Sequence, residues 1–242
     1  MPSTDKQSDL PPGFLVVDKP SGMSSMRVVS IVRRKAGGVK TGHAGTLDPL
    51  ATGVLVLALG RATRSIDLVM ATSKRYRTVI DLSAFTTTDD REGERTEITV
   101  PSPPSLELVR GSLASFDGTI LQAPPSFSAM KVGGRRAYQL ARGGKPPKLE
   151  PREVVVHSID LIDYAWPELE LDLHVGKGFY VRSLARDLGR MLGTGGHCAS
   201  IRRTAVGAFT LEGALEPDSL PDPLRADLLL DVDTAIRIAA RG

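Results

Sequence analysis

The chain has 242 residues, of which 41% are hydrophobic and 24% charged, and it carries a net charge of +3. This composition is that of a globular protein and excludes a fibrous or wholly disordered chain. The single cysteine, Cys198, excludes an intrachain disulfide and fits the reducing cytoplasm, where we expect the protein to work. No hydrophobic stretch is long enough to cross a membrane, so we expect no membrane association.

Residues 1–12 lack the apolar core of a signal peptide, and we expect a disordered leader there, followed by one domain over 13–242. "FLVV" (Phe14–Val17) predicts a buried strand, after which Ser24 or Ser25 caps a helix that runs to Arg34. "GVLVLALG" (Gly53–Gly60) predicts a central strand by its length and branched content.

The later elements follow from the same periodicities. They are a helix over 62–72, a strand over 74–84, an exposed loop over 86–94, a helix over 104–118 that starts at Ser105, a strand pair over 153–164 and 169–176, an amphipathic helix over 179–193 with Met191 on its core stripe, a last strand over 205–211 and a helical acidic end. This mixture lacks strict βαβ alternation and predicts an α/β (α+β) fold with a largely antiparallel sheet.

Charge is unevenly distributed along the chain. The stretch 131–152 holds seven bases against the single acid Glu150, whereas 211–236 holds seven acids against the single base Arg225. Two interpretations stay open from charge alone: a face that binds a polyanion, or two solvated surfaces of opposite sign. The Pro-, Gly- and base-rich segment 122–152 is too long for a simple connection, which is typical of a functional loop or a disordered one.

Several kinds of chemistry are excluded by spacing. The four histidines, His43, His157, His174 and His197, are scattered, so we expect no metal site. No phosphate loop, dinucleotide fingerprint or G-x-S-x-G turn is present. What remains is Asp48, which Pro49 biases toward an extended backbone in a glycine-rich loop. Spacing alone leaves open whether Asp48 is a turn residue or a catalytic carboxylate.

"GHAGTLDPLATGVL" resembles the active-site segment of the bacterial tRNA pseudouridine-55 synthases, the TruB family. Further segments are similar to that family in the same order: "GFLVVDKPSGMSS", "KRYR", "APPSFSAMKVGGRRAYQLAR", "GFYVRSLARDLG" and "IRRTAVGAF". The resemblance covers about residues 13–209 and implies the pseudouridine synthase fold, a mixed, mainly antiparallel sheet flanked by helices, with an RNA-gripping insertion over 122–152. Family members commonly carry a C-terminal PUA domain, and because the chain ends at Gly242 we expect none here.

The resemblance implies an enzyme that isomerises uridine to pseudouridine at position 55 in the tRNA T-loop, with base flipping and no cofactor. By the matching positions, Asp48 is the catalytic residue and Arg182 the cation that keeps it ionised. The implied uridine-site residues are His43, Tyr76, Tyr180 and Ile201, and the implied contacts to the RNA backbone are Lys131, Arg135, Arg136 and Arg142. The expected partner is the T-arm of tRNA, bound by a monomer that requires no protein partner.

Other interpretations remain. The same scaffold could serve as a tRNA-binding or folding chaperone, could modify another RNA as a guide-dependent relative, or could act on a small molecule. The chemistry residues favour an enzyme, the lack of lysine-rich tails and of a PUA domain argues against a guide-dependent relative, and the basic insertion argues against a small-molecule substrate. Arg182, Arg186 and Arg190, four apart, could form a solvated basic stripe, an interpretation that we keep for the latter two.

Overall fold

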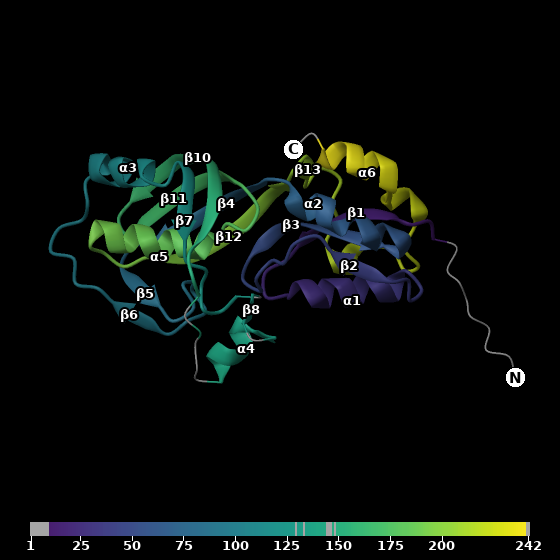
Figure 1. Ribbon diagram of the computed structural model, residues 1–242, viewed down its shortest axis with the longest axis horizontal. Coiled ribbons are helices and arrows are strands. Elements are labelled where there is room, and N and C mark those ends of the chain that lie inside the picture. The colour runs from purple at the N-terminus through teal and green to yellow at the C-terminus, as the bar shows by residue number, and fades with distance from the viewer. Residues whose placement is uncertain (1–9, 129, 133, 144–146, 148, 241–242) are drawn as a thin grey trace, which may run out of the picture. The chain divides into compact units, whose positions relative to one another are not determined.

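The chain folds into two compact units, and each is described by itself. The computed structural model describes residues 10–128, 130–132, 134–143, 147 and 149–240, so residues 1–9 of the expected leader lie outside it. Unit 1 comprises residues 1–75 and 202–242, and unit 2 comprises residues 76–201. Figure 1 shows the helices and strands of both.

Unit 1 is built around a short sheet. Its strand order is β14-β1-β3-β12, with β2 also paired to β3 and β13 to β12. β3 and β12 run parallel, whereas β3 pairs with β1 and β2, β1 with β14 and β12 with β13 in antiparallel register. Its elements are β1 (Gly13–Lys19), α1 (Ser25–Lys35), β2 (Thr41–His43), β3 (Thr52–Leu59), η1 (Gly60–Ser65), α2 (Ile66–Ala71), the end of β12 (His197–Val206), β13 (Phe209–Thr210), η2 (Pro217–Ser219), η3 (Ala226–Leu228), β14 (Leu230–Asp231) and α6 (Val232–Ala239).

The predicted central strand is confirmed as β3, and every residue from Gly53 to Leu59 in it is buried. Alternate residues of a strand point to opposite faces. Val54, Val56 and Ala58 therefore share one face, and they form a core cluster with side chains from α2 and α6. Figure 1 shows α1 and α6 on opposite sides of β1 and β3, so helices cover both faces and the strand can be apolar throughout.

Unit 2 contains the sheet order β12-β4-β11-β10-β7, of which β10 pairs antiparallel with both β11 and β7. α3 and α5 pack against each other (Figure 1). Its elements are β4 (Lys74–Asp81, which starts in unit 1), β5 (Ala84–Thr86), β6 (Arg95–Glu97), α3 (Leu106–Ala114), β7 (Gly118–Gln122), β8 (Lys131–Val132), β9 (Arg135–Arg136), α4 (Ala137–Arg142), β10 (Arg152–Ala165), β11 (Glu168–Val175), α5 (Val181–Leu192) and the start of β12.

Helix ends follow their capping residues. The Ser24 hydroxyl accepts a hydrogen bond from Arg27 N at the start of α1, and Ser105 caps α3 in the same way. α5 ends at Gly193, whose φ of 68° closes the last turn. The placement of Met191 on the core stripe was wrong, since its side chain is 51% exposed. The returning chain at Gly195 packs on Gly189, which is buried, while Met191 lies on the exposed side of the same turn.

Three other expectations need correction, and one strand was missed. The helix over 62–72 is a 3₁₀ turn, η1, followed by the short α2. The last strand already begins at His197 and turns at Gly207, where φ is 52°. The acidic end has only one α-helix, α6, within its described residues, because Pro217, Pro221 and Pro223 interrupt longer helices. β2 was not predicted, since three residues are too few for a periodic signal.

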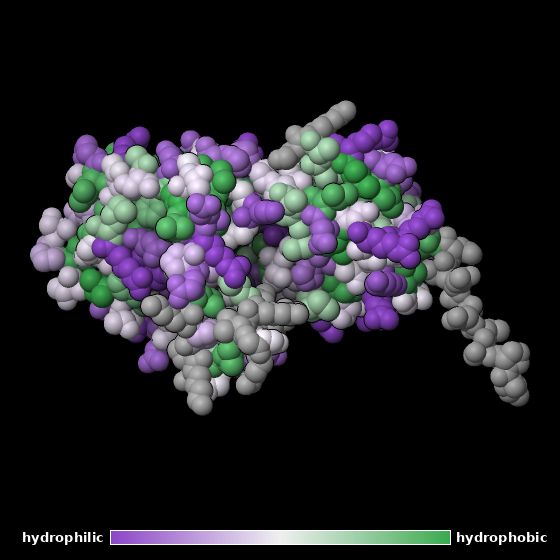
Figure 2. Space-filling model, viewed as in Figure 1, coloured by the Kyte–Doolittle hydropathy of each residue, from purple (hydrophilic) through white to green (hydrophobic). Residues whose placement is uncertain are grey.

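The mixed helix and strand content and the mainly antiparallel sheet confirm the predicted fold class. On the face shown in Figure 2, hydrophilic and hydrophobic side chains are interspersed. Within the described residues, no helix is both long and apolar enough to cross a bilayer.

Gly53 gives a sharp test of the parallel β3–β12 contact. Its φ is +101°, and a Cβ there would lie 2.2 Å from the Arg203 carbonyl oxygen. We expect Gly53→Ala to lower the free energy of unfolding by about 3 kcal/mol or more in urea denaturation. Gly38→Ala is the matched control, because its φ is +90° in open space, so backbone strain alone should cost about 1–2 kcal/mol. Equal losses in both variants would contradict the close approach.

Candidate active site

Asp48 lies in unit 1, in the loop over 44–51 that joins β2 to β3, which we call the Asp48 loop. The two residues beside Asp48 are both anchored. The Ser25 hydroxyl accepts a hydrogen bond from Leu47 N at 2.8 Å and donates one to Leu47 O at 2.9 Å. Lys19 Nζ donates to Pro49 O at 3.2 Å. The half-buried Asp48 therefore sits between two fixed peptide units.

Lys19 is fully buried, which is rare for a lysine. Besides Pro49 O, its ammonium donates to Pro20 O at 2.9 Å and Met23 O at 2.6 Å. Such hydrogen bonds replace those that a buried cation loses to water. Lys19 therefore ties the "DKPSG" turn to the far side of the Asp48 loop.

Arg203 of β12 holds the first part of the same loop. Its guanidinium donates to Gly45 O at 3.2 Å and Thr46 O at 3.4 Å, and to Val54 O of β3 at 2.8 Å. Lys19, Ser25 and Arg203 were all missed as site residues by sequence reasoning. The signal that could have found Lys19 is the "DKPSG" turn, whereas nothing local distinguishes Arg203 from Arg202 beside it.

The other predicted uridine-site residues are divided between the units. His43 lies in unit 1, half-buried on β2, where it pairs with Leu57 of β3. Unit 2 holds the rest: Tyr76 half-buried on β4, Tyr180 at the N-terminus of α5, Arg182 in its first turn and Ile201 buried on β12. Their roles at a uridine stay predictions.

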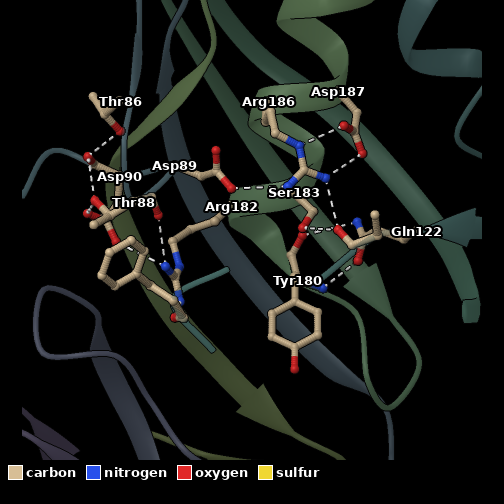
Figure 3. Close-up of polar contacts among 12 residues, drawn as sticks. Thr86, Thr88, Asp89, Asp90, Gln122, Tyr180, Arg182, Ser183, Arg186 and Asp187 are labelled. Atoms are coloured by element: carbon tan, nitrogen blue, oxygen red, sulfur yellow. Dashed lines mark hydrogen bonds and ion pairs between the residues drawn. The ribbon is translucent and has the colours of Figure 1, made fainter. Parts of the chain in front are cut away.

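Arg182 is buried among polar groups of unit 2 (Figure 3). Its guanidinium donates to Thr88 O at 2.8 Å and Phe127 O at 2.9 Å and forms an ion pair with Asp90 at 3.5 Å. The Asp90 carboxylate also accepts hydrogen bonds from the Thr88 hydroxyl and Glu92 N. The expected exposed loop over 86–94 was therefore wrong at Asp90, which is buried because it pairs with this arginine.

Arg186, one turn along α5, forms a second set of contacts (Figure 3). It pairs with Asp89 at 3.1 Å and Asp187 at 2.9 Å and donates to Ala123 O at 2.9 Å. Burial raises the pKa of Asp89, and the neighbouring Arg186 and Arg182 only partly oppose this. The solvated-stripe interpretation was wrong for Arg186, whose side chain is 11% exposed, because Asp89 and Asp187 enclose it; Arg190 is exposed as expected.

Gln122 fixes the backbone of Tyr180. The buried Gln122 amide accepts a hydrogen bond from Tyr180 N at 2.8 Å and donates to Tyr180 O at 3.1 Å (Figure 3). Gln122 is also the last residue of β7 and pairs across the sheet with Arg152 of β10. The predicted insertion over 122–152 therefore leaves the sheet and returns to it at one cross-strand pair.

Within the insertion, β8 and β9 form a short antiparallel pair that leads into α4. Ala137 N donates to Met130 O, and Tyr138 N donates to Ser128 O. These two hydrogen bonds join the start of α4 to the residues that precede β8. The side chains of Lys131, Arg135, Arg136 and Arg142 lie outside the described part of the structure. Their contacts to an RNA backbone stay predictions.

Two family models match the chain. Residues 33–181 match one described as TruB family pseudouridylate synthase (N terminal domain). Residues 182–236 match one described as tRNA pseudouridylate synthase B C-terminal domain.

Similar proteins carry related names. A Corynebacterium efficiens protein called tRNA pseudouridine synthase B is 45% identical over 223 residues, which cover 90% of this chain and 75% of that protein. A Dinoroseobacter shibae protein of the same name is 47% identical over 220 residues, covering 90% and 72%. This chain therefore spans about three quarters of their length.

Solved structures share the fold. One is the crystal structure of a Cbf5-Nop10-Gar1 complex, with a TM-score of 0.71 and 24% identity over 93% of this chain and 62% of that one. Another is an H/ACA RNP bound to a substrate RNA containing 2′-deoxyuridine, with a TM-score of 0.64 and 25% identity over 86% and 52%. This chain thus spans less than two thirds of either of them.

Asp89 and Asp90 are neighbours, but their replacement by asparagine is expected to affect stability differently at pH 7. Asp90→Asn removes a carboxylate from the buried Arg182 and should lower the free energy of unfolding by about 2–4 kcal/mol. Asp89→Asn should leave that free energy unchanged or raise it. Arg186 retains its ion pair with Asp187, and asparagine tolerates the φ of 59° at position 89.

The pH dependence of Asp89→Asn follows from the raised pKa of Asp89. Because the pKa of Asp89 is higher in the folded state, protonation of Asp89 at low pH stabilises that state. The wild type loses this stabilisation as the pH rises through the raised pKa. The asparagine variant has no such loss. Its stability relative to the wild type, measured by urea unfolding, should therefore be greater at pH 7 than at pH 4; the reverse order would contradict burial as the dominant effect.

Proposed function

Because the chain belongs to the TruB family of pseudouridylate synthases, we propose that it converts uridine to pseudouridine at position 55 in the T-loop of tRNA. The names of its relatives support tRNA as the substrate. We further propose a monomer that works in the cytoplasm without a protein partner.

The reaction is an isomerisation and balances without a cofactor. The N1–C1′ bond breaks, the detached uracil turns, and C5 bonds to C1′; C5 then loses a proton and N1 gains one. The enzyme must supply a nucleophile or an anionic stabiliser at the sugar or base, and a site that retains the free uracil. Asp48 is proposed for the first task, with attack at C1′, addition at C6 and a glycal route as alternatives.

The observation that carries this proposal is the anchoring of the Asp48 loop. Asp48 is the one acid in the sequence between Lys19 and Ile66. Both of its neighbours are fixed, Leu47 by Ser25 and Pro49 by Lys19. Catalysis gains most from groups that are held in position before the substrate arrives. If Asp48 served only as a turn residue, the peptide unit that follows it would not need to be fixed by a buried lysine.

The remaining roles follow from the types of side chain. We propose that Tyr76 and Tyr180 stack on the uracil and that Ile201 lines the same site. Arg182 is proposed to keep Asp48 ionised. A target base in a folded RNA loop must leave its stack to react, and His43 is proposed to occupy space beside the displaced nucleotides.

Asp48→Asn tests the proposed chemistry. Wild type and variant are incubated with an unmodified T-arm stem-loop, and pseudouridine is mapped at nucleotide resolution. We expect product at the T-loop uridine with wild type, and a rate reduced at least about 10³-fold in Asp48→Asn, with RNA affinity retained. Asp67→Asn, an exposed acid on α2, is the matched control and should behave as wild type.

Other outcomes would correct the proposal. Product from Asp48→Asn at the wild-type rate would remove Asp48 from the chemistry. Product at another uridine would correct the position. RNA binding without product from wild type would favour a tRNA-binding or folding chaperone.

The insertion is tested by the salt dependence of binding. Each phosphate contact releases counterions, so its loss flattens the slope of log affinity against log salt. We expect the double variant Arg135→Gln/Arg136→Gln to weaken stem-loop binding and to reduce that slope by about 1–2, measured by fluorescence anisotropy in increasing KCl. Arg225→Gln, an exposed arginine paired with Asp227, is the control. An unchanged slope in the double variant would exclude these two phosphate contacts.

A further inference from the structure

Arg203 is a buried cation whose contacts differ from those of an ordinary core arginine. Its side chain is 2% exposed, on β12 opposite Gly53 of β3. It donates to three backbone carbonyls, and no ion pair within the described part of the chain includes it. The acceptors belong to Gly45, Thr46 and Val54, the first part of the Asp48 loop and the start of β3.

A buried guanidinium is a costly way to stabilise a core. Taking a guanidinium out of water costs several kcal/mol, and well-packed apolar side chains of similar volume often serve a core at least as well. What a guanidinium offers instead is a planar set of donors in fixed geometry, which can hold several acceptors at defined positions. The Arg203 donors span the junction of the loop and the strand.

The contacts along the Asp48 loop divide into two groups. Ser25 and Lys19 hold residues 47 and 49. The first part of the loop contains Gly45, whose φ is +105°, and a glycine restricts its own backbone less than other residues do. Arg203 binds the carbonyl of Gly45 and that of the next residue, where the loop most needs an external constraint.

We propose that Arg203 is a positioning residue for Asp48, which fixes the first part of the Asp48 loop so that the carboxylate meets the uridine in one geometry. This inference rests on the proposed catalytic role of Asp48. A displacement of about 1 Å at a reacting group can reduce a rate on the order of 10²-fold, so a loosened loop should lower kcat. RNA affinity should be spared, because Arg203 is buried.

Arg202 provides a matched control on the same strand. It points to the opposite face, with its side chain 42% exposed, and pairs with Asp18 at 2.7 Å. Arg202→Met removes the ion pair and the positive charge, Arg202→Lys keeps the charge, and both leave the Asp48 loop contacts intact.

The experiment compares Arg203→Lys and Arg203→Met with Arg202→Lys and Arg202→Met. For each folded variant we measure kcat and KM on the T-arm stem-loop, the Tm, and hydrogen–deuterium exchange of backbone amides over residues 44–51. Arg203→Lys keeps the charge but replaces the three separate nitrogens that bind Val54 O, Thr46 O and Gly45 O with a single ammonium, which does not reproduce their planar spacing. We expect its kcat to fall at least about tenfold with KM within about twofold, and exchange over 44–48 to rise; the Arg202 variants should change neither.

An unchanged kcat in Arg203→Lys with an active wild type would overturn the proposal, as would a loss that appears only in KM or only in Tm. Unchanged exchange over 44–48 would also overturn it. An inactive wild type would instead contradict the proposed function, and the exchange data would still decide whether Arg203 orders the loop. If Arg203→Met fails to fold, Arg203→Lys carries the test.

Discussion

Hydrogen bonds from buried cations to backbone carbonyls are the constraint on which the Asp48 loop depends. Lys19 and Arg203 each lose their hydrogen bonds to water on burial. They replace them with hydrogen bonds to peptide oxygens of that loop and its flanks. The loop is short and contains Gly45 and Pro49, and it forms no regular secondary structure of its own. Its shape is set from outside, by β1, α1 and β12, which meet it from distant parts of the sequence.

In unit 2, arginines in the first turns of α5 also bind backbone carbonyls. Arg182 and Arg186 use carbonyls at Phe127 and Ala123 as acceptors, and pair with Asp90 and Asp89 on another segment. One helix thereby joins the start of the insertion to the loop after β5. Since Tyr180 begins this helix, the position of a proposed uracil-stacking residue is defined by the same contacts.

The sequence predicted the features that depend on local pattern. The apolar run of β3, the serine caps of α1 and α3 and the strand pair β10–β11 all produce a periodic or capping signal. The burial of Asp90 and Arg186 could not be predicted, because each depends on a partner distant in sequence. Likewise, Arg203 and Arg202 are identical neighbours, and only the pairing of β12 with β3 decides which one is buried. The composition of the acidic end favours helix, but its prolines interrupt longer helices there.

The pairing of Gln122 with Arg152 has a consequence for how this protein can vary. A segment whose two ends are adjacent in a ladder can lengthen at little thermodynamic cost, about 0.6 kcal/mol for each doubling of a flexible loop. Gln122 itself, bound to Tyr180, stays on the sheet side of that junction. The residues that follow Phe127 can therefore be exchanged for others of different length and charge, while α5 keeps its contacts to the carbonyls of Ala123 and Phe127.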